Sequence, residues 1–430
     1  MFAKEIKLAE KLIKKKQPRD GILLLLKTLA KLNTKETYSK KEYETAGQLF
    51  ASLLVVKSTR AIIEEYVAAV SQHGVVFLIN IAVEFGQLKG AITFLEEHYP
   101  LKDMELETIS FYLDILDSFM EREKALTVSH DYLALHPQLS LGNLTAINIL
   151  ESWEKGSPST IAGKEALLEP DIEFFSLLFK IIKIQYCEGK LHEAAILVAT
   201  IAPTVECNKD LQSSKIKNGY NYFQYIAKLL PLKKMYSEAP ANTVYMVGDS
   251  HCLSPAWDEI ALNKINYFIK PLLVTGCKIW HLRERSLFHA KTNFYRAIEL
   301  IPLGSTVIFI FGEIDCREGI LSAIRKGEYS SAKKAIDLLI DIYVKRIMEV
   351  IKARKLTHIY IHQIPPVLEA TRSIVNEFNQ LLEQKINSLN NNKISWLGFK
   401  GGLLDEKGGF NADFDFDETH LDPSYIHTAL

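Results

Sequence analysis

The sequence predicts an α-helical repeat array over residues 1–236, followed by an α/β domain over residues 243–430 with helices on both faces of a parallel sheet. Two observations lead to this fold class. Up to about residue 236, apolar residues recur at helical spacing, and glycine and proline are sparse and fall at turns. Beyond that point, short apolar runs alternate with helical segments, which is the pattern of βαβ units.

A recurring motif in the front half consists of a turn, a small residue and then an apolar helix. Its copies contain Gly21, Ala91, Ala125 and Ala194, and the successive separations are 70, 34 and 69 positions. One helix pair cannot bury its own apolar face, whereas stacked pairs can. The period near 34 resembles that of tetratricopeptide repeats (TPR), although the Trp, Leu-Gly and Tyr positions of that family are not cleanly filled. A non-repetitive helical bundle remains the alternative.

The segment Ser237–Thr243, with its small residues and proline, is predicted to be a linker. Five apolar runs after it predict buried strands, at 244–247, 272–275, 306–311, 358–362 and 394–397. Apolar residues at helical spacing predict helices over 332–354 and 373–387. A further helix is expected to begin near Ala256.

Ligands of such a sheet bind beyond the carboxyl ends of its strands, so the residues that follow each strand are candidates for chemistry. Gly248-Asp249-Ser250-His251 follows the first predicted strand. A serine hydroxyl becomes a nucleophile when a base lies within hydrogen-bond reach and a third group orients that base. His420 can take the Ser250 proton, and Asp417, three positions earlier, can orient its imidazole.

Together these residues resemble the SGNH (GDSL-type) hydrolases, a family of esterases, lipases and acyltransferases. The resemblance covers roughly residues 240–430 and rests on the joint order of four blocks: Gly248-Asp249-Ser250, Gly276 in Val274-Thr-Gly-Cys277, Gly312-Glu-Ile-Asp315 and Asp417-x-x-His420. It implies a three-layer, flavodoxin-like domain and an acyl-Ser250 intermediate. It also implies an oxyanion hole that includes the N–H groups of Ser250 and Gly276, and no metal or organic cofactor.

The third block departs from the family pattern, because Ile314 stands where the family has an oxyanion-binding asparagine. Losing one such donor costs about 2.7–4 kcal/mol in acyl-transfer enzymes. Arg317 is one candidate for the substitute donor. It could instead form an ion pair with Glu313 or bind an acidic group of the substrate through two hydrogen bonds. We assign substrate binding to the polar residues beside the blocks: Asp249, His251, Glu313, Asp315 and Arg317. Asp315 is also expected to hydrogen-bond loop backbone.

Each of these residues has a simpler interpretation. Ser250 could cap a helix, which serine favours, and His420 could be a surface histidine in an acidic tail. Asp249-x-His251 also matches the first ligand pair of calcineurin-like metallophosphoesterases. That family needs a later Gly-Asn-His-Asp/Glu block and a Gly-His-x-His block, and the sequence contains neither.

Composition excludes several classes of function. The formal net charge of −1 provides no electrostatic footprint for nucleic acid or an anionic membrane. The longest apolar runs are far shorter than the roughly 20 residues that span a bilayer. The N-terminal residues lack the uninterrupted apolar core of a secretory signal. The five cysteines form no CxxC pair, which argues against a zinc site or a disulfide framework. We therefore expect a cytoplasmic protein without a membrane span.

The function that the sequence predicts is a serine esterase of the SGNH type. Its substrate would be an acyl ester, such as an O-acetyl group on a carbohydrate or small molecule, and its helical repeats would bind a protein partner. Two alternatives stay open. One is an acyltransferase of the same fold, and the other is a catalytically weakened scaffold that acts through its repeats.

Overall fold

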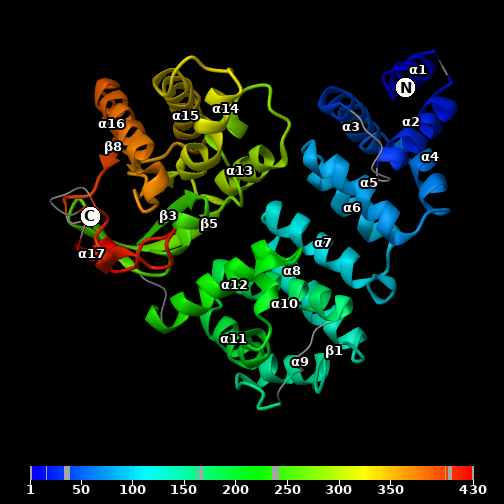
Figure 1. The fold of residues 1–430 in the computed structure, drawn as a ribbon, viewed down its shortest axis with the longest axis horizontal. Helices are drawn as coiled ribbons and strands as arrows, with labels where there is room; N and C mark the ends of the chain where they lie inside the picture. Colours follow the sequence, from blue (N-terminus) through cyan, green and yellow to red (C-terminus); the bar gives the residue numbers. More distant parts are fainter. Residues whose placement is uncertain are drawn as a thin grey trace. The chain divides into compact units, whose positions relative to one another are not determined.

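The structure is a computed structural model that describes residues 2–15, 17–32, 39–161, 163, 168–234, 242–401, 403–404 and 409–428. Of the predicted linker, residues 237–241 lie outside this part of the chain. The chain divides into two compact units. The helical unit comprises Met1–Ile184, Ala199–Tyr220 and Leu287–Thr292, and the sheet unit comprises Gln185–Val198, Asn221–Ser286 and Asn293–Leu430. The chain thus combines a helical part with an α/β part whose sheet is mostly parallel, as Figure 1 shows.

The first half of the chain is a succession of helices interrupted by one short hairpin, β1 and β2. The elements are α1 (Phe2–Lys14), α2 (Pro18–Leu32), α3 (Lys40–Leu54), α4 (Lys57–Val67), α5 (Gln72–Glu84), α6 (Leu88–His98), α7 (Leu106–Ser118), α8 (Arg122–Leu135), β1 (Ser140–Leu141), β2 (Leu144–Thr145), α9 (Ala146–Lys155), α10 (Glu169–Cys187), α11 (Leu191–Glu206) and α12 (Lys217–Leu229).

Four helix pairs share one turn geometry: α1–α2, α5–α6, α7–α8 and α10–α11. In each, the amide just before the second helix donates to a carbonyl five residues earlier. These bonds are Gln17 N to Leu12 O at 3.1 Å, Gln87 N to Ala82 O at 3.0 Å, Glu121 N to Leu116 O at 2.8 Å and Lys190 N to Gln185 O at 2.9 Å. The fourth residue of the second helix is always small and buried: Gly21, Ala91, Ala125 and Ala194. The recurring motif therefore corresponds to a recurring structure.

The small residue in this motif permits close packing of the two helices. A Cβ atom added at Gly21 would lie 2.7 Å from the carbonyl oxygen of Ala9 on the preceding helix. Any side chain at that position, alanine included, would push α1 and α2 apart, so this copy of the motif requires glycine, whereas the other three copies accommodate a buried alanine.

Six strands form the sheet, in the order β4-β5-β3-β6-β7-β8. They are β3 (Thr243–Gly248), β4 (Glu259–Leu262), β5 (Ile265–Leu273), β6 (Thr306–Ile310), β7 (His358–His362) and β8 (Ile394–Leu397). All neighbours are parallel except β4 and β5. Without β4, the order is that of a doubly wound sheet in which the first strand lies between the second and the third.

The chain after Ser250 differs from the prediction, and the helix expected near Ala256 is wrong. A short 3-10 helix (η4, Ser250–Leu253) follows β3, and the chain then enters the β4–β5 hairpin. The hairpin turns at Asn263 and Lys264, both with positive φ, which is the backbone of a two-residue type I′ turn. The same pairing makes β5 longer than the run predicted at 272–275, and Thr275 lies beyond its end.

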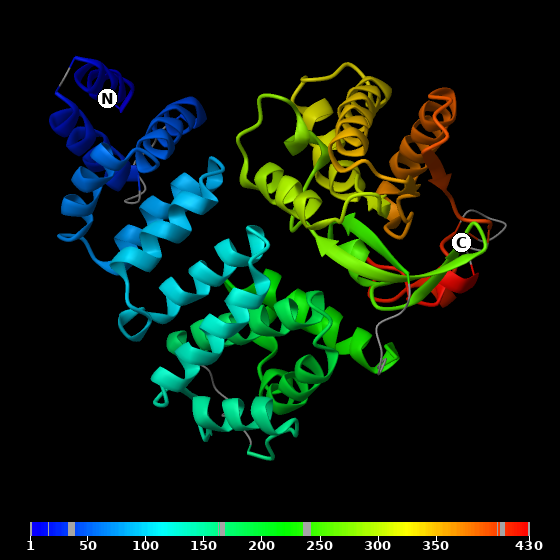
Figure 2. The same ribbon diagram turned by 180° about the vertical axis from the view of Figure 1, so that it is seen from behind.

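The remaining helices of the second half are α13 (His289–Leu300), α14 (Leu321–Arg325), α15 (Ala332–Arg354), α16 (Arg372–Ser388) and α17 (Tyr425–Thr428). The predictions at 332–354 and 373–387 agree with α15 and α16. These two helices pack side by side, as both ribbon views show (Figure 2).

No single helix among the described residues is long and apolar enough to cross a membrane. One bent pair, Lys40–Leu54 with Ser58–Val67, reaches the required length and composition only when its helices are taken together across a 111° bend.

A buried ion triad ties α7, α8 and α10 together in the helical unit. Asp117 accepts a hydrogen bond from Arg122 Nε at 2.6 Å and pairs with Lys183 Nζ at 2.9 Å. All three side chains are at most 10% exposed. Burial raises the pKa of Asp117, but the charges of Lys183 and Arg122 outweigh it and hold the pKa below its usual value. The carboxylate therefore stabilises the fold above pH 3.8, and this contribution is lost on acidification.

We predict that Asp117→Asn destabilises the helical unit by about 3–5 kcal/mol, because two buried cations lose their counter-charge. Hydrogen exchange of α7 and α10 amides, followed by mass spectrometry on the full chain, measures the effect. The control is Glu151→Gln, which removes an exposed ion pair with Lys155 and should change stability by less than about 1 kcal/mol. Equal exchange rates in both variants would contradict the role assigned to the triad.

Candidate active site

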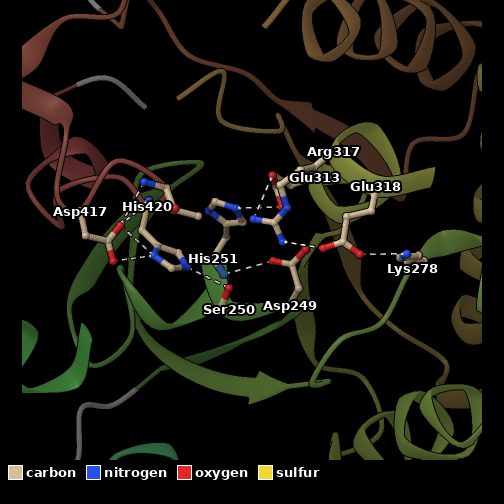
Figure 3. A network of polar contacts seen from close by, with 10 residues as sticks. Asp249, Ser250, His251, Lys278, Glu313, Arg317, Glu318, Asp417 and His420 are labelled. Atoms are coloured by element: carbon tan, nitrogen blue, oxygen red, sulfur yellow. Dashed lines mark hydrogen bonds and ion pairs between the residues drawn. The ribbon is translucent and has the colours of Figure 1, made fainter. Parts of the chain in front are cut away.

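The carboxyl end of β3 brings three side chains from two distant segments together. Ser250 Oγ lies 2.8 Å from Nε2 of His420, and Nδ1 of the same ring lies 2.9 and 3.0 Å from the two carboxylate oxygens of Asp417. Ser250 is half-buried, and the His420 residue is only 9% exposed. A hydroxyl, an imidazole and a carboxylate thus form a continuous hydrogen-bonded chain (Figure 3).

The Ser250 end of this chain depends on two structural features. A Cβ atom at Gly248 would lie 2.5 Å from the carbonyl oxygen of Ile310 on β6, so a glycine is required where β3 ends. Asp249 then caps the 3-10 helix, since its Oδ1 accepts from the amide of His251 at 3.1 Å. Ser250 therefore opens a short helix rather than capping a long one.

The Asp417–His420 segment forms a turn around the carboxylate. Asp417 Oδ1 accepts from the amides of Thr419 and His420 at 3.1 and 2.8 Å, and Glu418 adopts a positive φ of 66°. Burial raises the pKa of Asp417, but hydrogen bonding to His420 and to the two amides lowers it more, to about 2. The carboxylate is therefore ionised at neutral pH and fixes the ring through Nδ1.

The His420 pKa is lowered overall. Burial is the largest cause, and the positive charge of His251 adds to it, whereas Asp417 acts in the opposite direction. A lowered pKa keeps the imidazole neutral near pH 7, which is the form that can accept a proton. The ionised Asp417 would stabilise the imidazolium once it forms.

Three residues that the sequence analysis missed hold His420 in place. The Tyr225 ring, from α12, stacks on the His420 ring with 3.9 Å between centroids and 14° between planes. Ser254 Oγ donates to the carbonyl of Leu421 at 2.6 Å, and Lys233 Nζ donates to the carbonyl of Ser254 at 2.5 Å. No sequence motif marks these residues, because each acts through shape or a single backbone contact.

Gly276, the second predicted oxyanion donor, lies in the turn that follows β5, next to β3 in the sheet. It is exposed and has a φ of +63°, a conformation that other residues rarely adopt. The sheet order thus places the turn after β5 and the turn after β3 at the same edge.

Four of the five predicted substrate-binding residues, all except Asp315, form a second polar group beside Ser250. Asp249 and His251 flank the serine, and Glu313 reaches them from the segment after β6. His251 Nε2 lies 3.9 Å from Glu313 Oε2, and Arg317 Nη1 lies 3.6 Å from Glu313 Oε1. Figure 3 shows this group on the side of Ser250 opposite the Asp417–His420 pair.

Burial and mutual charge shift the pKa values in this group. Burial raises the pKa of Asp249 to about 6. For His251, burial lowers the pKa, but Glu313 and Asp249 raise it more, so the net shift is upward. For Glu313, burial raises the pKa, but His251 and Arg317 outweigh it, so the net shift is downward. These shifts favour a protonated His251 beside an ionised Glu313.

Asp315 has a different environment and lies apart from the reacting groups. Its two carboxylate oxygens accept from the amides of Ile279 and Trp280 at 2.7 and 3.2 Å, which joins the segments after β5 and β6. Burial raises its pKa to about 7. The contact is the loop-backbone bond expected from the sequence, and the carboxylate is fully enclosed.

Within the described part of the chain, one group of three side chains has the spacing of a metal site: Glu64, Glu97 and His98 in the helical unit. The Asp249–His251 pair belongs to no such group. No protein-family model matches the chain, and no curated protein or solved structure matches it.

We predict that Asp417→Asn lowers the pKa of His420 further, because the variant removes the one neighbouring charge in direct contact that favours the imidazolium. An NMR titration of the histidine ring protons measures the shift. Asp413→Asn, an exposed residue of the same loop, is the control and should leave the titration unchanged. An unchanged or higher His420 pKa in Asp417→Asn would contradict the electrostatic role of this carboxylate.

Proposed function

We propose that the protein is a serine esterase of the SGNH type. The observation that carries the proposal is the hydrogen-bonded chain from Ser250 through His420 to Asp417, with a 2.8 Å contact between the hydroxyl and the imidazole. The distance lies within the range in which a base can take a proton from a nucleophile. The lowered pKa of His420 and the ionised Asp417 give each group the charge that its role requires.

The proposed reaction has two steps, acylation of Ser250 and hydrolysis of the acyl-serine. Ser250 Oγ attacks the ester carbonyl carbon while its proton moves to His420 Nε2, and the carbonyl oxygen becomes an oxyanion. The intermediate collapses to an acyl-serine and expels the alcohol, which takes the proton from His420. Water then attacks the acyl-serine, with His420 again as the base, and releases the acid and the free serine.

The order of the strands supports the SGNH assignment. The four sequence blocks follow β3, follow β5, follow β6 and lie near the C-terminus, so each could contribute to one edge of the sheet. The N–H groups of Ser250 and Gly276 are the backbone donors for the oxyanion. The substrate class proposed is a short acyl ester, for example an O-acetyl group on a carbohydrate or small molecule.

The helical pairs support a TPR-like array that binds a protein partner. Their shared turn and their small fourth residue recur at the separations that the sequence predicts, with 34 positions between Ala91 and Ala125. Stacked helix pairs create extended surfaces that such repeats use for binding. A pull-down with the full chain and with surface variants of the array would test for the partner.

We predict that Ser250→Ala lowers p-nitrophenyl acetate turnover by at least about 10³-fold and abolishes labelling by a fluorophosphonate, because both require the nucleophile. Ser388→Ala, an exposed serine at the end of α16, is the matched control and keeps both activities. Equal turnover in the parent and Ser250→Ala would remove the esterase proposal. A burst without sustained turnover would instead indicate an acyltransferase.

We predict that Tyr225→Ala lowers kcat by about tenfold, because it removes a ring stack worth about 0.5–1.5 kcal/mol that orients His420. Tyr225→Phe keeps the ring and should retain near-parental kcat, since the buried hydroxyl has no hydrogen-bond partner in the described structure. Steady-state kinetics of the two variants on the same ester measure the difference. Equal losses in both variants would show that the ring stack does not position the base.

A further inference from the structure

The inference that follows rests on the proposed function and concerns its missing oxyanion donor. Ile314 occupies the position of the family's asparagine, two residues after Gly312 and four after the end of β6. An apolar side chain there cannot donate a hydrogen bond, so the backbone donors at Ser250 and Gly276 lack the third partner. A third donor from another residue would restore the stabilisation that the asparagine provides, about 10²–10³-fold in kcat.

Arg317 is three positions further along the chain, within the single turn of π-helix that spans Asp315–Ile320. Its side chain is 35% exposed, so part of the guanidinium faces solvent. Its two carboxylate contacts, 3.6 Å to Glu313 and 3.5 Å to Glu318, are longer than good hydrogen bonds. No direct hydrogen bond engages the guanidinium within the described residues, so its donors are available.

The positive charge of Arg317 affects the pKa of Asp249 and of His251, the residues on either side of Ser250. It lowers the pKa of Asp249 and opposes protonation of His251, although other groups dominate each pKa. Geometry connects the guanidinium to the candidate base through Glu313, which lies 3.6 Å from Arg317 Nη1 and 3.9 Å from His251 Nε2. The centroid of the His251 ring lies 4.9 Å from that of the His420 ring. Figure 3 shows the guanidinium beside the Asp249–His251 pair.

Glu313 contacts the guanidinium with one carboxylate oxygen and faces His251 with the other. Glu313 is only 7% exposed, and its carboxylate lies between the two cationic groups. The atoms Glu313 Oε1, His251 Nδ1 and His251 Nε2 are fully buried without hydrogen-bond partners, so substrate cannot reach them. Their role is to position Arg317, which is the accessible end of the group.

We propose that Arg317 donates the side-chain hydrogen bond to the oxyanion that the family takes from asparagine, with Glu313 and His251 as positioning residues. The alternative, recognition of an anionic substrate group, is disfavoured by charge. Three acidic groups, Glu313, Glu318 and Asp249, face the guanidinium and its cationic neighbours Lys278 and His251, so the charges of the group are balanced at neutral pH. A balanced guanidinium attracts a ground-state anion weakly but still offers its N–H groups to a charge that develops nearby.

The test compares Arg317→Ala and Arg317→Ala/Ile314→Asn with the parent, on a neutral ester and on an ester that carries a carboxylate. We expect Arg317→Ala to lower kcat on both esters by about 10²–10³-fold with little change in KM, as for loss of an oxyanion donor. Restoring the family's asparagine should recover at least about tenfold of the lost kcat. Arg325→Ala, an exposed arginine on α14, is the control.

Three further measurements test the role of Arg317 and separate it from an effect on folding. The affinity for a trifluoromethyl ketone, which mimics the oxyanion, should fall in parallel with kcat/KM in Arg317→Ala. Glu313→Gln should lower kcat less than Arg317→Ala does, and should add little when combined with it. Circular dichroism of each variant checks that the chain remains folded.

Several outcomes would overturn the inference. A loss restricted to the anionic ester, or a change in KM alone, would show that Arg317 binds a substrate anion. Unchanged kinetics in Arg317→Ala would exclude both roles while leaving the esterase intact. A parent protein without turnover or fluorophosphonate labelling would contradict the proposed function itself, and the role of Arg317 with it.

Discussion

The hydrogen bond between Ser250 Oγ and His420 Nε2 joins groups separated by 170 positions, and the rest of the candidate site depends on it. The bond can form because β3 lies between β5 and β6 in the sheet. The chain leaves β3 toward β5 and leaves β6 toward β7, so the connections after these two neighbouring strands lead to opposite edges of the sheet, and ligands of doubly wound sheets bind at such a switch point. The segment that carries Asp417 and His420 is held beside Ser250 by the hydrogen bond that Ser254 Oγ donates to the carbonyl oxygen of Leu421. Sheet order thus places Ser250 at the switch point, and one backbone contact helps to place His420 beside it.

The surroundings of His420 affect its pKa in two opposite directions, as the proposed role of this residue requires. A base must be neutral before the reaction, and its cation must be tolerated during it. Burial and the charge of His251 favour the neutral ring, whereas Asp417 favours the cation. His251 and Asp417 therefore have opposite effects on the pKa of one imidazole, and Glu313 acts in the same direction as Asp417. Each charge in the site has a buried partner that stabilises it. Glu313 lies beside His251, and the amides of Thr419 and His420 donate hydrogen bonds to Asp417.

Periodicity and strand-end chemistry predicted much of this arrangement from the sequence. The β3, β7 and β8 strands and the α15 and α16 helices agree with their apolar patterns, and Ser250, Asp417 and His420 meet as their order suggested. The β4–β5 hairpin was not predicted because a helix was expected after Ser250, although exposed and buried residues alternate within Glu259–Leu262. Tyr225 and Lys233 were missed for another reason. A stacking ring and a buried amine act through tertiary contacts, which leave no local pattern in the sequence.

The position of Tyr225 has a consequence for where the candidate site begins. The family-like blocks cover roughly residues 240–430, yet the ring that covers His420 comes from α12, and Lys233 lies just beyond that helix. Both residues precede the first strand and belong to the sheet unit. A burial-lowered pKa of His420 requires a covered ring, so α12 contributes to the chemistry as well as to packing. In the proposed mechanism the strand ends and loops would supply the reacting groups, and the helix before them supplies the environment that lowers the pKa of His420.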